Sequence, residues 1–186
     1  MSGLLRQVPN ILSALRLVAA PFTAYLIVQR SDTMALCIFG MAGLSDALDG
    51  FLAKRYSLTS RFGEWLDPAA DKLLMLASFV TLTAIGAVPL WLTVLVIGRD
   101  AAIVLGIAAA RLVDAPLRIA PLIVGKASTV VQVAYIALIL LLLAVDLGIP
   151  WLVTAGSIVV TFFTLWSFLA YTLVWLQAVA ARRRPA

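Results

Sequence analysis

Apolar stretches long enough to cross a lipid bilayer recur along this chain, and they restrict the folds that are open to it. Of its 186 residues, 63% are hydrophobic and only 12% are charged, whereas a soluble domain is about half apolar. Because lipid offers no hydrogen bonds, spanning segments must pair their backbone groups internally, as helices do. The sequence lacks the short segments of alternating polarity that a membrane barrel requires. We therefore predict an all-α integral membrane protein.

Turn and charge signals divide the apolar sequence into segments of roughly the 20 residues that a span needs. The six predicted transmembrane helices are 11–29, 33–55, 68–87, 90–111, 123–146 and 151–177. A short interfacial helix is predicted before them, over Leu4 to Val8. Together the spans are predicted to form a single membrane domain over residues 1–186.

Basic residues are concentrated in alternate connections of this predicted bundle. They occupy the N-terminus, the second-to-third and fourth-to-fifth loops and the C-terminal tail, whereas the opposite side carries little beyond Arg30. The positive-inside rule then places both termini in the cytoplasm. This topology accounts for most of the net charge of +5, so no nucleic-acid partner is expected. The N-terminus resembles neither a cleavable signal nor a transit peptide, which favours a bacterial inner (plasma) membrane.

The chain contains no histidine and one cysteine, Cys37. Imidazole ligands, histidine general bases and Ser-His-Asp triads are therefore excluded. One thiol builds neither a disulfide nor a zinc site. The chemistry that remains uses carboxylate, lysine, arginine and hydroxyl groups, which suit oxygen-preferring cations such as Mg²⁺ or Mn²⁺.

Four aspartates interrupt the apolar sequence at the ends of the second and third predicted spans: Asp46, Asp49, Asp67 and Asp71. The members of each pair are three or four residues apart, so each pair shares one helix face. A carboxylate among lipid tails costs about 2.5–3.5 kcal/mol, and clustered carboxylates repel one another. Divalent cations that neutralise the cluster would account for it. The alternatives are a solvated helix end for Asp46 and Asp49, and for Asp67 an N-cap before Pro68.

These residues belong to the pattern Asp-x₂-Asp-Gly-x₂-Ala-Lys-x₈-Gly-x₃-Asp-x₃-Asp, which runs from Asp46 to Asp71. The pattern resembles the signature of the CDP-alcohol phosphatidyltransferases, integral membrane enzymes of phospholipid synthesis. One departure is Lys54, where the family usually has arginine; lysine keeps the charge but loses the bidentate fork. The segment Pro9-Asn10-Ile-Leu-Ser-Ala-Leu-Arg16 is similar to the start of the phosphatidylglycerol and cardiolipin branches.

This resemblance implies a reaction and a set of roles. The four aspartates would hold two divalent ions, and Asp71 would also be the general base for the acceptor hydroxyl. The donor would be CDP-diacylglycerol, and related enzymes are commonly homodimers. The residues implied to line the CDP site are Asn10, Gly50, Ala53, Lys54 and Gly63. Packing between small residues is the alternative role for the two glycines, and a helix start is the alternative for Asn10.

The acceptor is suggested by charges around the fourth span. Arg99 and Asp100 interrupt it, and an intramembrane charge is a functional hypothesis by default, with a local ion pair as the alternative. The residues predicted to bind the acceptor phosphate are Arg99, Arg111, Arg118 and Lys126. Their pattern resembles the CMP-forming cardiolipin synthases, which use phosphatidylglycerol. Phosphatidylglycerophosphate synthases, which use glycerol 3-phosphate, typically carry an arginine where this chain has Ile107.

A small transporter with intramembrane carboxylates along its ion path is the rival class of function. Such transporters often show repeated halves with broken helices at the midplane. The sequence shows no such repeat, and its acidic residues gather toward one membrane face. An enzyme is therefore the favoured interpretation.

Overall fold

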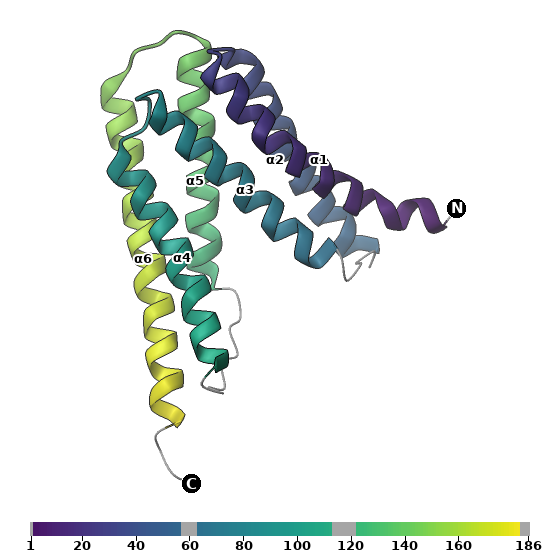
Figure 1. Ribbon diagram of the computed structural model, residues 1–186, viewed down its shortest axis with the longest axis vertical. Helices are drawn as coiled ribbons and strands as arrows, with labels where there is room; N and C mark the ends of the chain where they lie inside the picture. Colours follow the sequence, from purple (N-terminus) through teal and green to yellow (C-terminus); the bar gives the residue numbers. More distant parts are fainter. Residues whose placement is uncertain (1, 57–62, 113–121, 183–186) are drawn as a thin grey trace. The chain divides into compact units, whose positions relative to one another are not determined.

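Every regular element in the part of the chain that the computed structural model describes is an α-helix (Figure 1). That part comprises residues 2–56, 63–112 and 122–182, with side chains described for 14–45, 69–109, 122–177 and 180. The helices are α1 (Ser2–Val28), α2 (Asp32–Tyr56), α3 (Gly63–Ala84), α4 (Leu90–Leu112), α5 (Ile123–Ala144) and α6 (Pro150–Arg182). The predicted all-α class is confirmed.

The helices group into two compact units. The first unit contains α1, α2, α3 and the second part of α5, and α1 packs against both α2 and α3. Its core is apolar, with Ile27 of α1, Ala35 of α2 and Leu82 of α3 completely buried. In this unit α1 is the element that brings two other helices together.

The second unit contains α4, α6 and the first part of α5. Helices α4 and α6 run side by side (Figure 1). Buried polar side chains join α5 to α6: Gln132 Nε2 donates to Thr164 Oγ1 at 3.2 Å, and the hydroxyls of Tyr135 and Ser157 lie 2.8 Å apart. Tyr135 follows Gln132 in α5, whereas its partner Ser157 precedes Thr164 in α6, so the two helices are antiparallel.

Three helices are long and apolar enough to cross a membrane among the residues whose side chains are described: Leu90–Ala109, Ile123–Ala144 and Pro150–Gln177. Shorter apolar segments cover Ala14–Val28 and Asp32–Ser45. Large apolar side chains also point outward along these segments; Leu105, for example, is 67% exposed. A surface of this kind suits lipid rather than water. The structure therefore supports a membrane protein, whereas the count of six spans stays a prediction.

Several hydroxyl groups within these helices are satisfied locally. Ser78 donates to the carbonyl of Leu74 at 2.8 Å, and Thr161 donates to the carbonyl of Ser157 at 2.7 Å. Each bond reaches four residues back along the same helix, where a serine or threonine hydroxyl can share a carbonyl that is already in the helix ladder. A hydroxyl bonded in this way can face lipid without an unpaired polar group.

The three connections that follow α1, α3 and α5 are tight turns with a common geometry. After α3, Gly86 N–H donates to Thr83 at 2.9 Å and Ala87 N–H donates to Leu82 at 2.9 Å. Gly86 has a φ of 78°, so this end is a Schellman motif with glycine in the left-handed position. The ends of α1 and α5 have the same pair of bonds, but Arg30 (φ 57°) and Asp146 (φ 51°) take that position.

Several helix limits differ from the prediction. Residues Leu4 to Val8 belong to α1 itself, so the predicted separate interfacial helix is wrong. Helix α3 begins at Gly63 rather than residue 68, which puts Asp67 inside the helix and makes its predicted N-cap role wrong. Glu64 and Asp67 lie outside the apolar run because they are charged, but charge does not end a helix. Helix α6 continues to Arg182 rather than residue 177, through alanines that favour the helix.

The left-handed residues give a test of the turn geometry. Gly86→Ala should lower the free energy of unfolding by about 1 kcal/mol, because a Cβ is strained at this φ. No described atom lies within 4 Å of that Cβ, so backbone strain alone is measured. Asp146→Gly should raise the free energy of unfolding, by less than Gly86→Ala lowers it, because aspartate tolerates this conformation better than alanine does. Thermal unfolding in detergent, followed by helical circular dichroism, compares the variants. An unchanged Gly86→Ala protein would contradict the left-handed turn.

Candidate functional site

Asp71 is the one predicted metal ligand whose side chain lies within the described residues. It belongs to α3, and Arg16 of α1 forms an ion pair with it, from guanidinium Nη1 to carboxylate Oδ1. The Arg16 side chain is 2% exposed and that of Asp71 is 39% exposed. A buried guanidinium needs such a partner, because an uncompensated buried charge is strongly destabilising. The pair therefore fixes the carboxylate where α1 packs on α3 and leaves it partly accessible.

The other three predicted ligands are placed only through their helices. Asp46 and Asp49 lie in α2, and Asp67 lies in α3, one turn before Asp71. Their side chains lie outside the described residues. Among the described side chains no group of three or more potential metal ligands is present, which leaves the four-carboxylate cluster a prediction. Carboxylate oxygen is nevertheless the ligand type that Mg²⁺ and Mn²⁺ prefer.

The residues predicted to line a CDP site also lie in the helices of the first unit. Asn10 is in α1, Gly50, Ala53 and Lys54 are in α2, and Gly63 is the first residue of α3. Their side-chain positions lie outside the described residues. What the structure adds is a role for Arg16, six residues after Asn10 in α1, for which no separate role was predicted. An arginine in an otherwise apolar helix was the available signal, but its partner is 55 residues away in the sequence.

Arg99 occupies the most elaborate polar cluster described in the second unit. It is 7% exposed. Its Nη1 donates to Asp100 Oδ1 at 2.6 Å, its Nη2 donates to Ser167 Oγ of α6, and its guanidinium carbon lies 5.7 Å from the Tyr171 ring centroid. At that distance a cation–π interaction is expected. The ion pair that the sequence raised as an alternative role for Arg99 is present.

One donor of this cluster finds no acceptor within the described part of the chain. Arg99 Nε is buried and makes no hydrogen bond with any described residue, although an N–H left unpaired in a buried setting costs about 1–3 kcal/mol. An oxygen from a bound molecule or water would satisfy it. Arg99 could also bind an anion by exchanging Asp100 for it. The arrangement can therefore accept an oxygen ligand, but it is already held without one.

The remaining predicted acceptor contacts are only partly described. Lys126 is exposed on the first turn of α5. Its neighbour Gly125 packs closely on α6: a Cβ there would lie 2.8 Å from Tyr171 Oη, so only glycine allows this approach. Arg111 is in α4, and its side chain lies outside the described residues, as does the whole of Arg118. Arg99 is the cation that lies over the Tyr171 ring, whereas Lys126 follows Gly125 in sequence and is exposed.

Comparison with known proteins identifies what the chain is similar to. The sequence profile of the CDP-alcohol phosphatidyltransferase family matches residues 6–179. The CMP-forming cardiolipin synthase of Homo sapiens is 34% identical over 181 residues, which are 89% of this chain and 57% of that protein. That of Streptomyces coelicolor is 43% identical over 100 residues, covering 50% of this chain and 46% of that protein. The chain therefore spans about half the length of the cardiolipin synthases it matches.

A second kind of relative aligns over more of its own length. A probable phosphatidylglycerophosphate synthase of Mycobacterium tuberculosis is 33% identical over 163 residues, which are 83% of this chain and 76% of that protein. Both kinds of relative carry names of phospholipid-synthesising enzymes, and they differ in the product named.

The Arg16–Asp71 pair can be tested without any activity measurement. Arg16→Met and Asp71→Asn should each destabilise the protein, because each leaves one partner of a partly buried pair behind. The double variant should be more stable than the sum of the two losses predicts, by about 0.5–3 kcal/mol, the range for residues in contact. Thermal unfolding of all four proteins in one detergent gives the coupling. Strictly additive losses would show that the pair does not form in solution. As a control, Arg16→Met is combined with Thr81→Val, elsewhere in α3, and the losses of these two variants should be additive.

Proposed function

The chain belongs to the CDP-alcohol phosphatidyltransferase family, and from this membership we propose that it transfers the phosphatidyl group of CDP-diacylglycerol to phosphatidylglycerol. The products are cardiolipin and CMP. The observation that carries the proposal is the Asp71 carboxylate, which buried Arg16 holds at a partly accessible position within the family's signature. The names of the human and Streptomyces relatives support phosphatidylglycerol as the acceptor.

The chemistry assigned to Asp71 is proton transfer. A hydroxyl of the acceptor's glycerol head group attacks the phosphorus that is bonded to diacylglycerol. Its proton passes to an Asp71 carboxylate oxygen, the new phosphorus–oxygen bond forms, and the bond to the CMP phosphate oxygen breaks. Phosphoryl-type transfer relies mainly on positioning and charge stabilisation. A carboxylate held by a buried guanidinium meets the first of these requirements.

Two divalent ions, Mg²⁺ or Mn²⁺, are proposed to be held by Asp46, Asp49, Asp67 and Asp71. When bound, they supply positive charge to the pyrophosphate and to the departing oxygen. The structural support is Asp71, which takes a cationic partner in Arg16 and keeps its side chain 39% exposed. A carboxylate in that setting favours positive charge around it. The other three carboxylates follow the same one-turn spacing on their helices.

Asn10, Gly50, Ala53, Lys54 and Gly63 are proposed to contact CDP. They share the first unit with Asp71, which supports one donor-binding region built from α1, α2 and α3. Small residues at three of these positions would let the nucleotide approach the helix backbone closely.

The acceptor phosphate is proposed to contact Arg99, Arg111, Arg118 and Lys126. Arg99 and Arg111 are twelve residues apart on α4, or roughly 18 Å along the axis, so one phosphate group contacts both only if it lies between them and both side chains extend toward it. The helix end with Arg111 and the exposed Lys126 suit a head group at the membrane surface. Arg99 would bind the acceptor only through Nε or by exchange with Asp100.

Glycerol 3-phosphate is the second candidate acceptor. It is favoured by the Mycobacterium tuberculosis relative, of which this chain covers 76%. Membership of a transferase family leaves the transporter alternative without support.

The cellular setting follows from the sequence. We propose one membrane domain with six spans, both termini in the cytoplasm and the catalytic carboxylates on that side. The charge asymmetry of the connections supports this topology. A bacterial plasma membrane as the location and a homodimer as the assembly are part of the same proposal.

A reconstituted assay tests the reaction. The purified protein in phosphatidylcholine vesicles should release CMP from labelled CDP-diacylglycerol when phosphatidylglycerol and Mg²⁺ or Mn²⁺ are present. A chelator should abolish release. Asp71→Asn should lower the rate at least about 100-fold, the lower range for a lost general base, while the protein still inserts. Near-normal turnover by Asp71→Asn, or no CMP with any acceptor, would overturn the proposal. The labelled product decides between the two acceptors: cardiolipin indicates phosphatidylglycerol, and phosphatidylglycerophosphate indicates glycerol 3-phosphate.

Arg99 gives a separate test of acceptor binding. Arg99→Ala should raise KM for the acceptor about tenfold, the effect of roughly one lost charge-assisted hydrogen bond, and leave KM for CDP-diacylglycerol unchanged. Ser167→Ala is the matched control, because it removes a partner of Arg99 but keeps the guanidinium. Equal losses for both substrates in Arg99→Ala would show that Arg99 acts only as a structural ion pair.

A further inference from the structure

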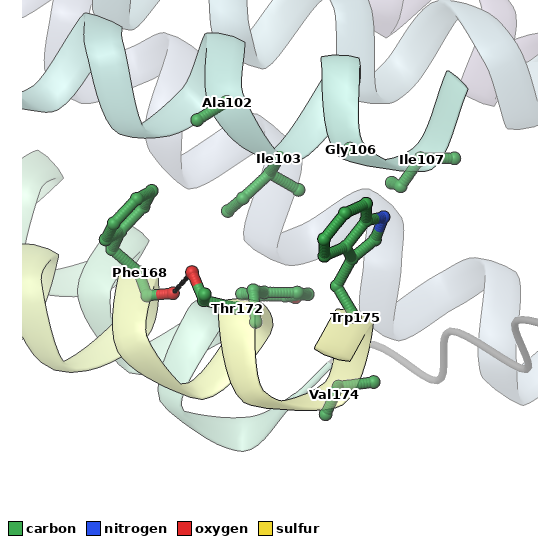
Figure 2. A pocket seen from close by; sticks show the side chains of 9 residues that line it. Ala102, Ile103, Gly106, Ile107, Phe168, Thr172, Val174 and Trp175 are labelled. Atoms are coloured by element: carbon green, nitrogen blue, oxygen red, sulfur yellow. Dashed lines mark hydrogen bonds between the residues drawn. The ribbon is translucent and has the colours of Figure 1, made fainter. Parts of the chain in front are cut away.

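An apolar groove of about 270 Å³ lies between α4 and α6 in the second unit. It is lined chiefly by Ala102, Ile103, Gly106 and Ile107 of α4 and by Phe168 and Trp175 of α6. Figure 2 shows the two rings of α6 turned toward this row of α4 residues, with the indole nitrogen on the side of Ile107. Both walls belong to segments long and apolar enough to span a membrane. A groove with such walls suits a chain of methylene groups.

The side chains that line the groove carry almost no free polar groups. The Thr172 hydroxyl, which lies in its wall, donates to the carbonyl of Phe168 at 2.8 Å (Figure 2). The exceptions are the Tyr171 hydroxyl and Trp175, whose buried indole Nε1 has no hydrogen-bond acceptor among the described residues. A buried indole N–H usually finds a partner. A ligand that is apolar except for one oxygen able to accept a hydrogen bond would match this lining. An acyl chain that ends in an ester carbonyl is such a ligand.

The sequence carries a basic residue just beyond the part of α4 toward which the indole nitrogen lies (Figure 2). Arg111 follows Ile107 by one turn of α4. Tyr171, which also lines the groove, packs closely on Gly125, and the exposed Lys126 follows Gly125 in the first turn of α5. A phospholipid has a phosphate, an ester and a hydrocarbon chain in this order. Its phosphate would lie at the end of the groove near Arg111, its ester at Trp175, and its hydrocarbon chain along Ile103 and Phe168.

We infer that this groove binds an acyl chain of the lipid acceptor, with its phosphodiester at Lys126 and Arg111. The inference rests on the proposed function and deepens it, because an acyl-chain site selects a phospholipid acceptor over glycerol 3-phosphate. The acceptor, rather than the donor, is the occupant because the groove shares its unit with the proposed acceptor contacts. Asp71 and the proposed CDP contacts belong to the first unit.

Photolabelling of the unaltered protein tests occupancy. A phosphatidylglycerol carrying a diazirine near the ester of one acyl chain is added to the protein in phosphatidylcholine vesicles, and labelled residues are mapped by mass spectrometry. We expect label on Ile103, Ile107 or Trp175 that excess phosphatidylglycerol removes and excess phosphatidylcholine does not. Label removed by CDP-diacylglycerol but not by phosphatidylglycerol would assign the groove to the donor and overturn the inference. Label that neither lipid removes would mean that only bulk lipid enters the groove, and it would overturn the inference as well.

A matched pair of glycine variants measures the consequence for turnover. Gly106 lies inside the groove, where a Cβ would sit 3.9 Å from Trp175 Cδ1, whereas Gly98 is exposed on the same helix with no described atom within 4 Å of its Cβ. Gly106→Leu should raise KM for phosphatidylglycerol about tenfold, which is about 1.4 kcal/mol, and leave KM for CDP-diacylglycerol unchanged. Gly98→Leu should change neither. Equal effects of the two variants would contradict the inference.

Two further readouts keep the result unambiguous. Ile107→Ala only removes atoms, so it reports on the groove if Gly106→Leu fails to fold. It should also raise KM for phosphatidylglycerol, and no change would count against the groove.

CMP release is followed in parallel. If CMP forms from phosphatidylglycerol but specific labelling is absent, the groove assignment fails and the transferase proposal stands. If labelling is specific for phosphatidylglycerol but no acceptor yields CMP, the groove assignment stands and the transferase proposal fails.

Discussion

The absence of water from the bilayer interior is the constraint on which the described structure depends. Each polar group within a spanning segment needs a partner supplied by the protein, since lipid supplies none. Serine and threonine hydroxyls meet this need one turn back in their own helices, as Thr81 does with the carbonyl of Ala77 at 2.7 Å. Gln132 meets it between helices, through Thr164. The same need pairs Arg16 with Asp71 and Arg99 with Asp100, so the charges that chemistry requires are also the ones packing must accommodate.

The two charged pairs differ in a way that bears on function. Arg16 and Asp71 come from different helices and fix how α1 packs on α3, so loss of either partner disturbs a tertiary contact. Arg99 and Asp100 are adjacent in sequence, and the tertiary contacts of Arg99 are with Ser167 and Tyr171 of α6. The first pair therefore positions a partly accessible carboxylate, and the second keeps a buried guanidinium in place with one donor still unpaired among the described residues. Each pair thus keeps one charged group available to a ligand within its own unit.

Hydropathy predicted the helical class and the approximate helix positions, because the need for about 20 apolar residues is a local property. It misplaced the start of α3 and the end of α6, where the helix continues through charged or alanine-rich sequence outside the apolar core. The family resemblance included both Asp71 and Arg16 but did not pair them, because their contact depends on how α1 packs on α3. Arg99 was singled out by its charge, whereas Ser167 and Tyr171 carried no signal in the sequence. Nothing in the spacing of Gly106 and Trp175 indicated a groove, which exists only once α4 and α6 lie side by side.

In the proposed reaction, apolar contact rather than charge would decide which acceptor is used. Phosphatidylglycerol and glycerol 3-phosphate both carry a phosphate, so arginines and lysines bind either one. They differ in hydrocarbon, and each buried methylene contributes about 0.8 kcal/mol. A protein that binds only the phosphate cannot discriminate between the two molecules, but a protein with an apolar groove beside its cations can. The indole N–H of Trp175, unpaired among the described residues, lies in that groove. The proposed site would therefore favour a hydrocarbon chain that begins with an ester. Phosphatidylglycerol has such a chain, and glycerol 3-phosphate does not.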